Sequence, residues 1–459
     1  MTTSTPAQRE DVNVVDPRQV KRAITAATIG NLTEWYDFGV YAYLATTIGK
    51  VFFPSSSTTT QLLATFGTFA VAFLVRPLGG MFFGPLGDRV GRTKVLAATM
   101  IMMAIGTFCI GIIPSYETIG IAAPALLLLA RLVQGFSTGG EYGGAMTFIA
   151  EYTPDRRRGF FGSFLEFGTL VGFILGAGTV ALLTAALSEQ DMLSWGWRIP
   201  FLVALPMGLI GLYLRLKLGE TPAFAKHSEE RAQDEKRTKR EEFRFIFVEN
   251  WRAMVACVGL VLTYNVACYM FFSYMPTYMS VELKSDISDT ESNLLQVGVM
   301  SAMLLVITFI GRLSDRVGRR PVLLAGAGSM VVLAFPALLL IQVGTTASAF
   351  AGLLLMGLMV VFFAATMTSA LPALFPTEVR QGALSISFNV SVSLFGGTTA
   401  SVMTALIAVS GDLMWPAYYL VAAGVIGGLA VWRIAESANK PLKGAPPAVE
   451  MGEEPASER

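Results

Sequence analysis

Ionisable side chains interrupt several long apolar stretches in the first half of this sequence. Glu34 and Asp37 stand three residues apart in one stretch, so a helix would place both carboxylates on one face. Arg76, Arg131 and Glu141 interrupt two further stretches. A charged residue at the centre of a membrane helix costs about 2.5 to 3.5 kcal/mol on insertion scales, so such a group normally faces a partner or a water-filled cavity. The pattern predicts a buried polar site that can titrate.

The acidic and basic residues of this site are expected to have different roles. We expect the carboxylate that binds and releases a proton to be among Glu34, Asp37 and Glu141. Arg76 and Arg131 would balance its charge or hold the carboxylate of a substrate. The alternative is that these groups form fixed ion pairs that only position the helices.

Uncharged polar and aromatic side chains complete the candidate substrate site. At 100° per residue, Arg131, Gln134 and Glu141 fall within about 80° of one helix face. Aromatic faces attract quaternary ammonium groups, although packing and interfacial anchoring are the commoner roles of aromatic residues in membrane proteins. The predicted substrate contacts are Arg76, Arg131, Trp35, Tyr36, Tyr41, Gln134, Tyr264, Asn265 and Asn389, and further tyrosines nearby are Tyr43, Tyr269 and Tyr274.

The elements that must position these residues are membrane helices. The chain is 53% hydrophobic and only 15% charged, whereas soluble proteins carry about 25% charged residues. Its apolar stretches are long enough to cross a hydrocarbon core of about 30 Å. We expect twelve spans, at 24–53, 61–84, 95–113, 121–150, 160–187, 199–217, 252–280, 294–313, 321–343, 348–375, 382–409 and 415–433. Close helix packing is predicted where glycines have GxxxG-type spacing, at Gly139/Gly143, Gly140/Gly144 and Gly168/Gly172/Gly176.

Charge distribution predicts the topology. Most of the 34 lysines and arginines fall in the arm before the first span, in alternate loops and in the tail, which places both termini in the cytoplasm. No cleavable signal peptide is evident in the polar first 22 residues. The expected organisation is an arm at 1–23, a six-helix bundle at 24–217, a cytoplasmic linker at 218–251, a second six-helix bundle at 252–433 and a short tail at 434–459.

The two halves repeat each other. GPLGDRVGRTK (84–94) follows the second span and GRLSDRVGRRP (311–321) follows the eighth. A second pair, EYTPDRRRG (151–159) and FPTEVRQG (375–382), follows the fourth and tenth spans. Paired parallel halves place a substrate site between them, near the middle of the membrane. We therefore expect an all-α membrane protein of two pseudo-symmetric six-helix bundles.

The doubled loop motif resembles the hallmark loop of the major facilitator superfamily, and the chain as a whole resembles the metabolite:proton symporters within it. The matching stretches include GNLTEWYDFGVY (30–41), FLVRPLGGMFFGPLGDRVGR (73–92), QGFSTGGEYGGA (134–145), AEYTPDRRRGFFGSF (150–164) and LPALFPTEVR (371–380). The resemblance implies a cytoplasmic gate of interhelical charge contacts formed by Asp88, Arg89, Arg92, Asp315, Arg316 and Arg319. The alternative for these residues is a role in topology alone.

The resemblance implies proton-coupled symport of a small zwitterionic osmolyte such as proline or glycine betaine. Symport of a carboxylate metabolite of the 2-oxoglutarate, citrate or shikimate type is the alternative, and a channel or solute-sensing receptor is a third reading. No phosphate-binding loop, catalytic constellation or zinc spacing occurs, so we expect no enzyme activity, no metal and no cofactor, with the proton gradient as the energy source.

The remaining expectations concern partners and regulation. They are a small-molecule substrate, a proton and the lipid bilayer, no nucleic acid, and a monomer in a bacterial inner membrane. The resembling osmolyte carriers have a long C-terminal coiled coil, which the short tail with Pro446, Pro447 and Pro455 does not provide.

Overall fold

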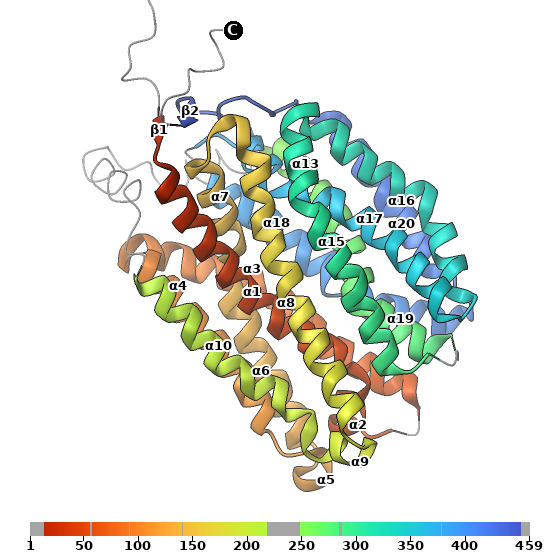
Figure 1. Ribbon diagram of the computed structural model, residues 1–459. Coiled ribbons are helices and arrows are strands. Elements are labelled where there is room, and N and C mark those ends of the chain that lie inside the picture. The colour runs from red at the N-terminus through yellow and green to blue at the C-terminus, as the bar shows by residue number, and fades with distance from the viewer. Residues whose placement is uncertain are drawn as a thin grey trace, which may run out of the picture.

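The computed structural model describes residues 13–55, 57–90, 92–139, 141–217, 248–283, 287–377 and 379–450. Its long helices run side by side along one elongated bundle, with the first half of the chain beside the second (Figure 1). The first and last described residues, Asn13 and Glu450, lie at the same end of the bundle, which we call the terminal end. The other end is called the distal end.

The helices of the first half follow the predicted spans, with two breaks. The span predicted at 24–53 is divided at Leu44, and the span predicted at 121–150 is divided after Thr138. These helices are α1 (Pro17–Tyr43), α2 (Ala45–Phe52), α3 (Thr58–Val90), α4 (Arg92–Ile112), α5 (Tyr116–Ile119), α6 (Ala122–Thr138), α7 (Glu141–Tyr152), η2 (Asp155–Arg157), α8 (Arg158–Ala186), α9 (Glu189–Asp191), η3 (Met192–Gly196) and α10 (Arg198–Lys217).

The second half repeats this arrangement with π-helical turns inside its first and fifth spans. Such turns insert an extra residue into a helix and are frequent at functional sites. The elements are α13 (Trp251–Tyr269), η5 (Met270–Tyr274), α14 (Met275–Thr277), η6 (Tyr278–Glu282), α15 (Asp289–Val317), α16 (Arg319–Gln342), α17 (Thr346–Ala370), η7 (Pro372–Leu374), α18 (Arg380–Ser391), η8 (Val392–Gly396), α19 (Thr399–Ser410) and α20 (Trp415–Arg433). Two short strands, β1 (Asn13–Val15) and β2 (Ala448–Glu450), pair in parallel at the terminal end.

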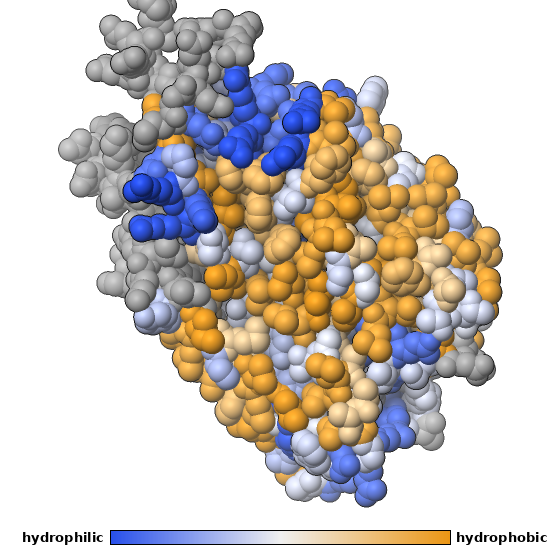
Figure 2. Space-filling model, in the orientation of Figure 1, coloured by the Kyte–Doolittle hydropathy of each residue, from blue (hydrophilic) through white to orange (hydrophobic). Residues whose placement is uncertain are grey.

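The outer surface is apolar, as a lipid-facing surface must be. Within the described ranges, eight helices are long and apolar enough to cross a membrane, and a ninth is added if the bent pair Glu189–Gly196 and Arg198–Ile210 counts as one span. Figure 2 shows an apolar surface between two polar ends. Exposed side chains such as Leu305, Phe309 and Val409 supply this surface.

Helix α8 is the central element, because it packs against α1 of its own half and α15 of the other. Small residues allow these approaches, as the glycine spacing predicts. A Cβ atom added at Gly172 of α8 would lie 2.5 Å from the carbonyl oxygen of Leu32 on α1. One added at Gly143 of α7 would lie 2.5 Å from the hydroxyl of Ser385 on α18. The prediction of close packing at these glycines is confirmed.

The crossing of α3 and α6 gives a stability prediction. A methyl group at Gly79 of α3 would collide with the carbonyl oxygen of Phe136 on α6. Overpacking of this kind typically costs about 1–3 kcal/mol, so we expect Gly79→Ala to lower the midpoint of thermal unfolding of the purified protein. The matched control is Gly67→Ala on the same helix, where an added Cβ meets no atom within 4 Å. Equal midpoints for the two variants would contradict the packing described here.

Candidate functional site

Two buried charges form an ion pair between α1 and α3. Arg76 donates from Nη2 to Oε1 of Glu34 at 2.8 Å, and neither side chain is more than 2% exposed. The guanidinium group of Arg76 lies over the rings of Phe38, at 4.8 Å, and Phe73, at 4.6 Å. Two of the predicted site residues are thus brought together, and a buried charge is balanced by a buried charge.

A second polar network links Asp37 to Arg131 through two intervening side chains. The hydroxyl of Thr107 on α4 donates to Asp37 Oδ2 at 2.7 Å, and Gln134 donates to Thr107. Arg131 donates to Gln134 Oε1 at 2.9 Å and lies 3.4 Å from the ring centroid of Tyr41. Sequence reasoning missed Thr107, because a single threonine in an apolar stretch carries no distinguishing signal.

A small pocket between α1 and α7 brings two predicted proton-coupling carboxylates together. Its volume is about 10 Å³, enough for roughly one water molecule, and Glu34 and Glu141 both line it. Glu141 is the first residue of α7, so the break between α6 and α7 places it there. The other lining residues are Ala27, Gly30, Asn31, Tyr142 and Ala145.

Aromatic rings close the interface between the two halves beside Arg76. Tyr269, at the end of α13 in the second half, lies 5.2 Å from Phe73 and 6.1 Å from Trp35 between ring centroids. The Tyr269 hydroxyl is buried and has no hydrogen-bond partner within the described residues. The ion pair of Glu34 and Arg76 is therefore next to the interface between the halves.

The other predicted substrate contacts, Tyr36, Tyr264, Asn265 and Asn389, lie on several different helices. Tyr36 donates to the carbonyl of Pro200 on α10, and Asn389 donates to the carbonyl of Gly139, which joins α18 to the break after α6. Asn265 is buried, with its Nδ2 unpartnered among the described residues. The hydroxyl of Tyr264 binds Glu166. Their roles as substrate contacts stay predictions.

Asp315 joins the two halves at the terminal end. Its carboxylate oxygens accept hydrogen bonds from the backbone of Gly159, at 2.7 Å, and Phe160, at 2.8 Å, in the first turn of α8. A helix N-terminus favours a negative charge. A second link between the halves is the ion pair of Arg380 with Glu151, at 2.7 Å. Both links must break if the halves part at this end.

The remaining gate residues differ in position. Arg319 is buried at the start of α16, whereas Arg316 is exposed. The side chains of Asp88, Arg89 and Arg92 lie outside the described part of the structure, as does most of the linker predicted at 218–251.

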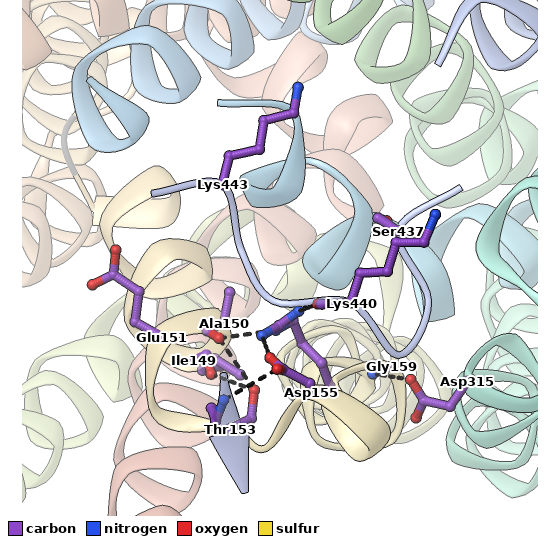
Figure 3. Close-up of polar contacts among 12 residues, drawn as sticks. Ile149, Ala150, Glu151, Thr153, Asp155, Gly159, Asp315, Ser437, Lys440 and Lys443 are labelled. Carbon is purple, nitrogen blue, oxygen red and sulfur yellow. Dashed lines mark hydrogen bonds and ion pairs between the residues drawn. The ribbon is translucent and has the colours of Figure 1, made fainter. Parts of the chain in front are cut away.

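The C-terminal segment 434–450 crosses the terminal end, and we call it the strap (Figure 3). On the second half, Asn439 donates to the backbone carbonyl of Asp315 at 3.0 Å, and Arg380 donates to that of Lys443 at 2.8 Å. On the first half, Arg158 donates to the carbonyl of Lys440 at 3.1 Å. The strap thus binds both halves next to Asp315.

Glu436 anchors the strap to α16. Its carboxylate accepts hydrogen bonds from the backbone of Arg319, Arg320, Ser437 and Ala438. Burial raises the pKa of Glu436, but these four donors outweigh it and hold the pKa below its ordinary value. At pH values above the ordinary pKa of a glutamate, the ionised Glu436 therefore stabilises the docked strap. This stabilisation is lost as the pH falls through the lowered pKa of Glu436.

The fold and the site together define a membrane transporter with a charged site at the interface of two helical halves. Residues 23–448 match the model of the sugar (and other) transporter family, and the chain belongs to this family within the major facilitator superfamily. It is a multi-pass protein of the inner membrane, and its curated relatives are named as transporters rather than enzymes.

Several curated proteins align with nearly the whole length of this chain. The proline/betaine transporter of Salmonella typhimurium is 48% identical over 447 residues, which are 96% of this chain and 89% of that protein. The glycine betaine/proline/ectoine/pipecolic acid transporter of Dickeya dadantii is 49% identical over the same shares of the two chains. The ectoine/proline transporter of Corynebacterium glutamicum is 43% identical over 97% of this chain and 90% of that protein.

Solved structures agree on the fold. A proton:xylose symporter bound to 6-bromo-6-deoxy-D-glucose aligns with a TM-score of 0.74 at 17% identity, covering 93% of this chain and 98% of that one. A partially occluded, inward-open form of the xylose transporter from E. coli aligns at 0.72 and 18% identity, covering 93% and 100%. The predicted major facilitator fold is confirmed.

The contacts of Asp315 predict that it keeps the terminal end closed. A reporter is available in Ser163, which is buried on α8 where Gly311 of α15 approaches it. In a protein whose only cysteine replaces Ser163, we expect Asp315→Ala to increase the rate of alkylation several-fold, since opening exposes this position. The control is Arg433→Ala, which removes an exposed charge in the last turn of α20, outside the predicted gate. Equal rates in the parent and Asp315→Ala would contradict the gate.

Proposed function

We propose that this protein is a proton-coupled symporter of a small zwitterionic osmolyte such as proline or glycine betaine. The observation that carries the proposal is the buried ion pair of Glu34 and Arg76 beside the interface between the halves. The names of the relatives supply the substrate class, because those from Salmonella typhimurium and Dickeya dadantii are named for proline and betaine.

The ion pair suggests how a proton and a substrate are coupled. When Glu34 takes up a proton, Arg76 loses its counter-ion inside a low-dielectric site, and the carboxylate of a substrate replaces it. The neighbouring rings of Phe73 and Tyr269 provide aromatic surface for the ammonium group. Proton and substrate then favour each other's binding, and this coupling is reciprocal.

The other charged groups support the same cycle. Glu141 shares the pocket of Glu34, so it is placed to pass a proton between Glu34 and water. Asp37, which is linked to Arg131, is the other candidate carrier. When the proton leaves, Glu34 pairs with Arg76 again and displaces the substrate.

Transport by this scheme requires alternating access. In our proposal twelve spans form two bundles, at 24–217 and 252–433, and both termini and the terminal end face the cytoplasm. The protein works as a monomer without a cofactor, and the proton gradient supplies the energy. One proton moved through about 150 mV supports roughly 300-fold accumulation of a neutral solute.

One observation favours a second candidate, a symporter of a carboxylate metabolite. The Nε and Nη2 atoms of Arg131 are buried without hydrogen-bond partners in the described region. A substrate with two carboxylates would use Arg131 in addition to Arg76. A zwitterion with one carboxylate needs only Arg76, which lies nearer the interface.

Uptake measurements separate these candidates. In a host without its own osmolyte transporters, labelled proline, glycine betaine and 2-oxoglutarate are offered with and without a protonophore. We expect proline or betaine uptake that the protonophore abolishes. Uptake of 2-oxoglutarate alone would establish the second candidate, and protonophore-resistant accumulation would overturn proton coupling.

Mutation of the three carboxylates identifies the coupling residue. We expect the Glu34→Gln variant to bind substrate at all pH values, because Arg76 then has no counter-ion in the protein. Its accumulation of substrate against a gradient should fall at least tenfold. Asp37→Asn and Glu141→Gln are compared under the same conditions, and the matched control is Glu189→Gln, an exposed acid at the distal end. Wild-type proton coupling in all three variants would contradict the assignment.

A further inference from the structure

Another buried carboxyl group, outside the ion pair, joins the two halves. Glu166 lies on α8, and the hydroxyl of Tyr264 on α13 donates to its Oε2 atom at 2.6 Å. Both side chains are at most 3% exposed. The other carboxyl oxygen, Oε1, is buried and has no hydrogen-bond partner in the described part of the chain.

The surroundings of Glu166 offer no cation. Within the described residues it forms no ion pair with a lysine or arginine, in contrast to Glu34 and Glu151. The titratable groups that face it from α13 are Tyr264, Cys268 and Tyr269.

The other helices packed against α8 supply no cation at this depth. Helix α17 contains no charged residue, and α15 carries charges only near its two ends. Helix α1 begins to pack on α8 at Val20 and Ile24, where its cations Lys21 and Arg22 are exposed to the outside. Beyond Thr28, which meets Gly168 of α8, the charged residues of α1 are Glu34 and Asp37, both acids. The charge of α7 that lies nearest the site is Glu141, another acid.

An ionised carboxylate in this place would have lost its water without gaining a positive partner. A proton on Oε1 removes that charge while Tyr264 continues to donate to Oε2. When the halves part, α13 withdraws from α8, water reaches the carboxyl group and the proton can leave to it. Closure therefore favours uptake of one proton and opening favours its release.

We propose that Glu166 is a second proton-carrying carboxyl group of the transport cycle, controlled by the approach of Tyr264 across the interface between the halves. This inference rests on the proposed proton symport and adds one proton per cycle to the one exchanged at Glu34. The competing explanation is that Glu166 only holds the helices together through its hydrogen bond to Tyr264. The two explanations predict different effects of replacing Glu166 by glutamine.

The test is the number of protons moved per substrate, obtained from the membrane potential and pH gradient at which net flux stops in reconstituted vesicles. Glu166→Gln keeps an oxygen that accepts from Tyr264 but cannot titrate, so we expect the ratio to fall by one while substrate exchange between the two sides continues. An unchanged ratio would overturn the proposal. If the wild-type protein itself moves no proton with substrate, the proposed symport fails instead.

Tyr264→Phe tests the same inference if the glutamine variant shows no exchange. It leaves the carboxyl group able to titrate but removes the hydroxyl that stabilises the ionised form. We expect an unchanged ratio and a shift to higher pH in the half-maximal point of uptake. Control variants are Cys268→Ala, which removes a neighbouring thiol without adding a donor, and Glu189→Gln, which is exposed. A pH profile identical to that of the wild type would overturn the role of Tyr264.

Discussion

The ion pair of Glu34 and Arg76 is the constraint on which the rest of the structure depends. Removing one partner of a buried pair typically costs about 3–5 kcal/mol, because the other charge is left without water or a counter-ion. One proton moved through about 150 mV supplies a similar free energy. When Glu34 loses its negative charge, another anion must therefore pair with Arg76. This requirement can couple the movement of protons down their gradient to the transport of a solute.

The surrounding helices exclude water from this ion pair and hold it close to the interface between the halves. Helix α8 packs against both halves, and the halves meet at both of its ends. At the distal end Thr290 donates to Thr184 at 2.7 Å, and at the terminal end Asp315 binds the first turn of α8. The halves are thus in contact on both sides of the site. Because the strap binds both halves at the terminal end, opening there requires it to release at least one of them.

Much of the fold and part of the site could be predicted from the sequence. Apolar length and the repeated loop motifs are local signals, and charges such as Glu34 and Arg76 stand out in apolar helices. The missed features depend on tertiary proximity: Thr107 gains importance only from partners on other helices, and the strap resembles an ordinary polar tail. The break at Leu44 was missed as well, because no proline or glycine accompanies it in the sequence.

The most direct test of the central claim is proton uptake on substrate binding, measured with a pH-sensitive dye in weakly buffered detergent solution of the purified protein. If substrate replaces Glu34 as the partner of Arg76, adding proline or glycine betaine should draw protons from the solution, and the Glu34→Gln protein should draw about one fewer per bound substrate. Binding of the substrate by the wild-type protein with no proton uptake at any pH would contradict the account.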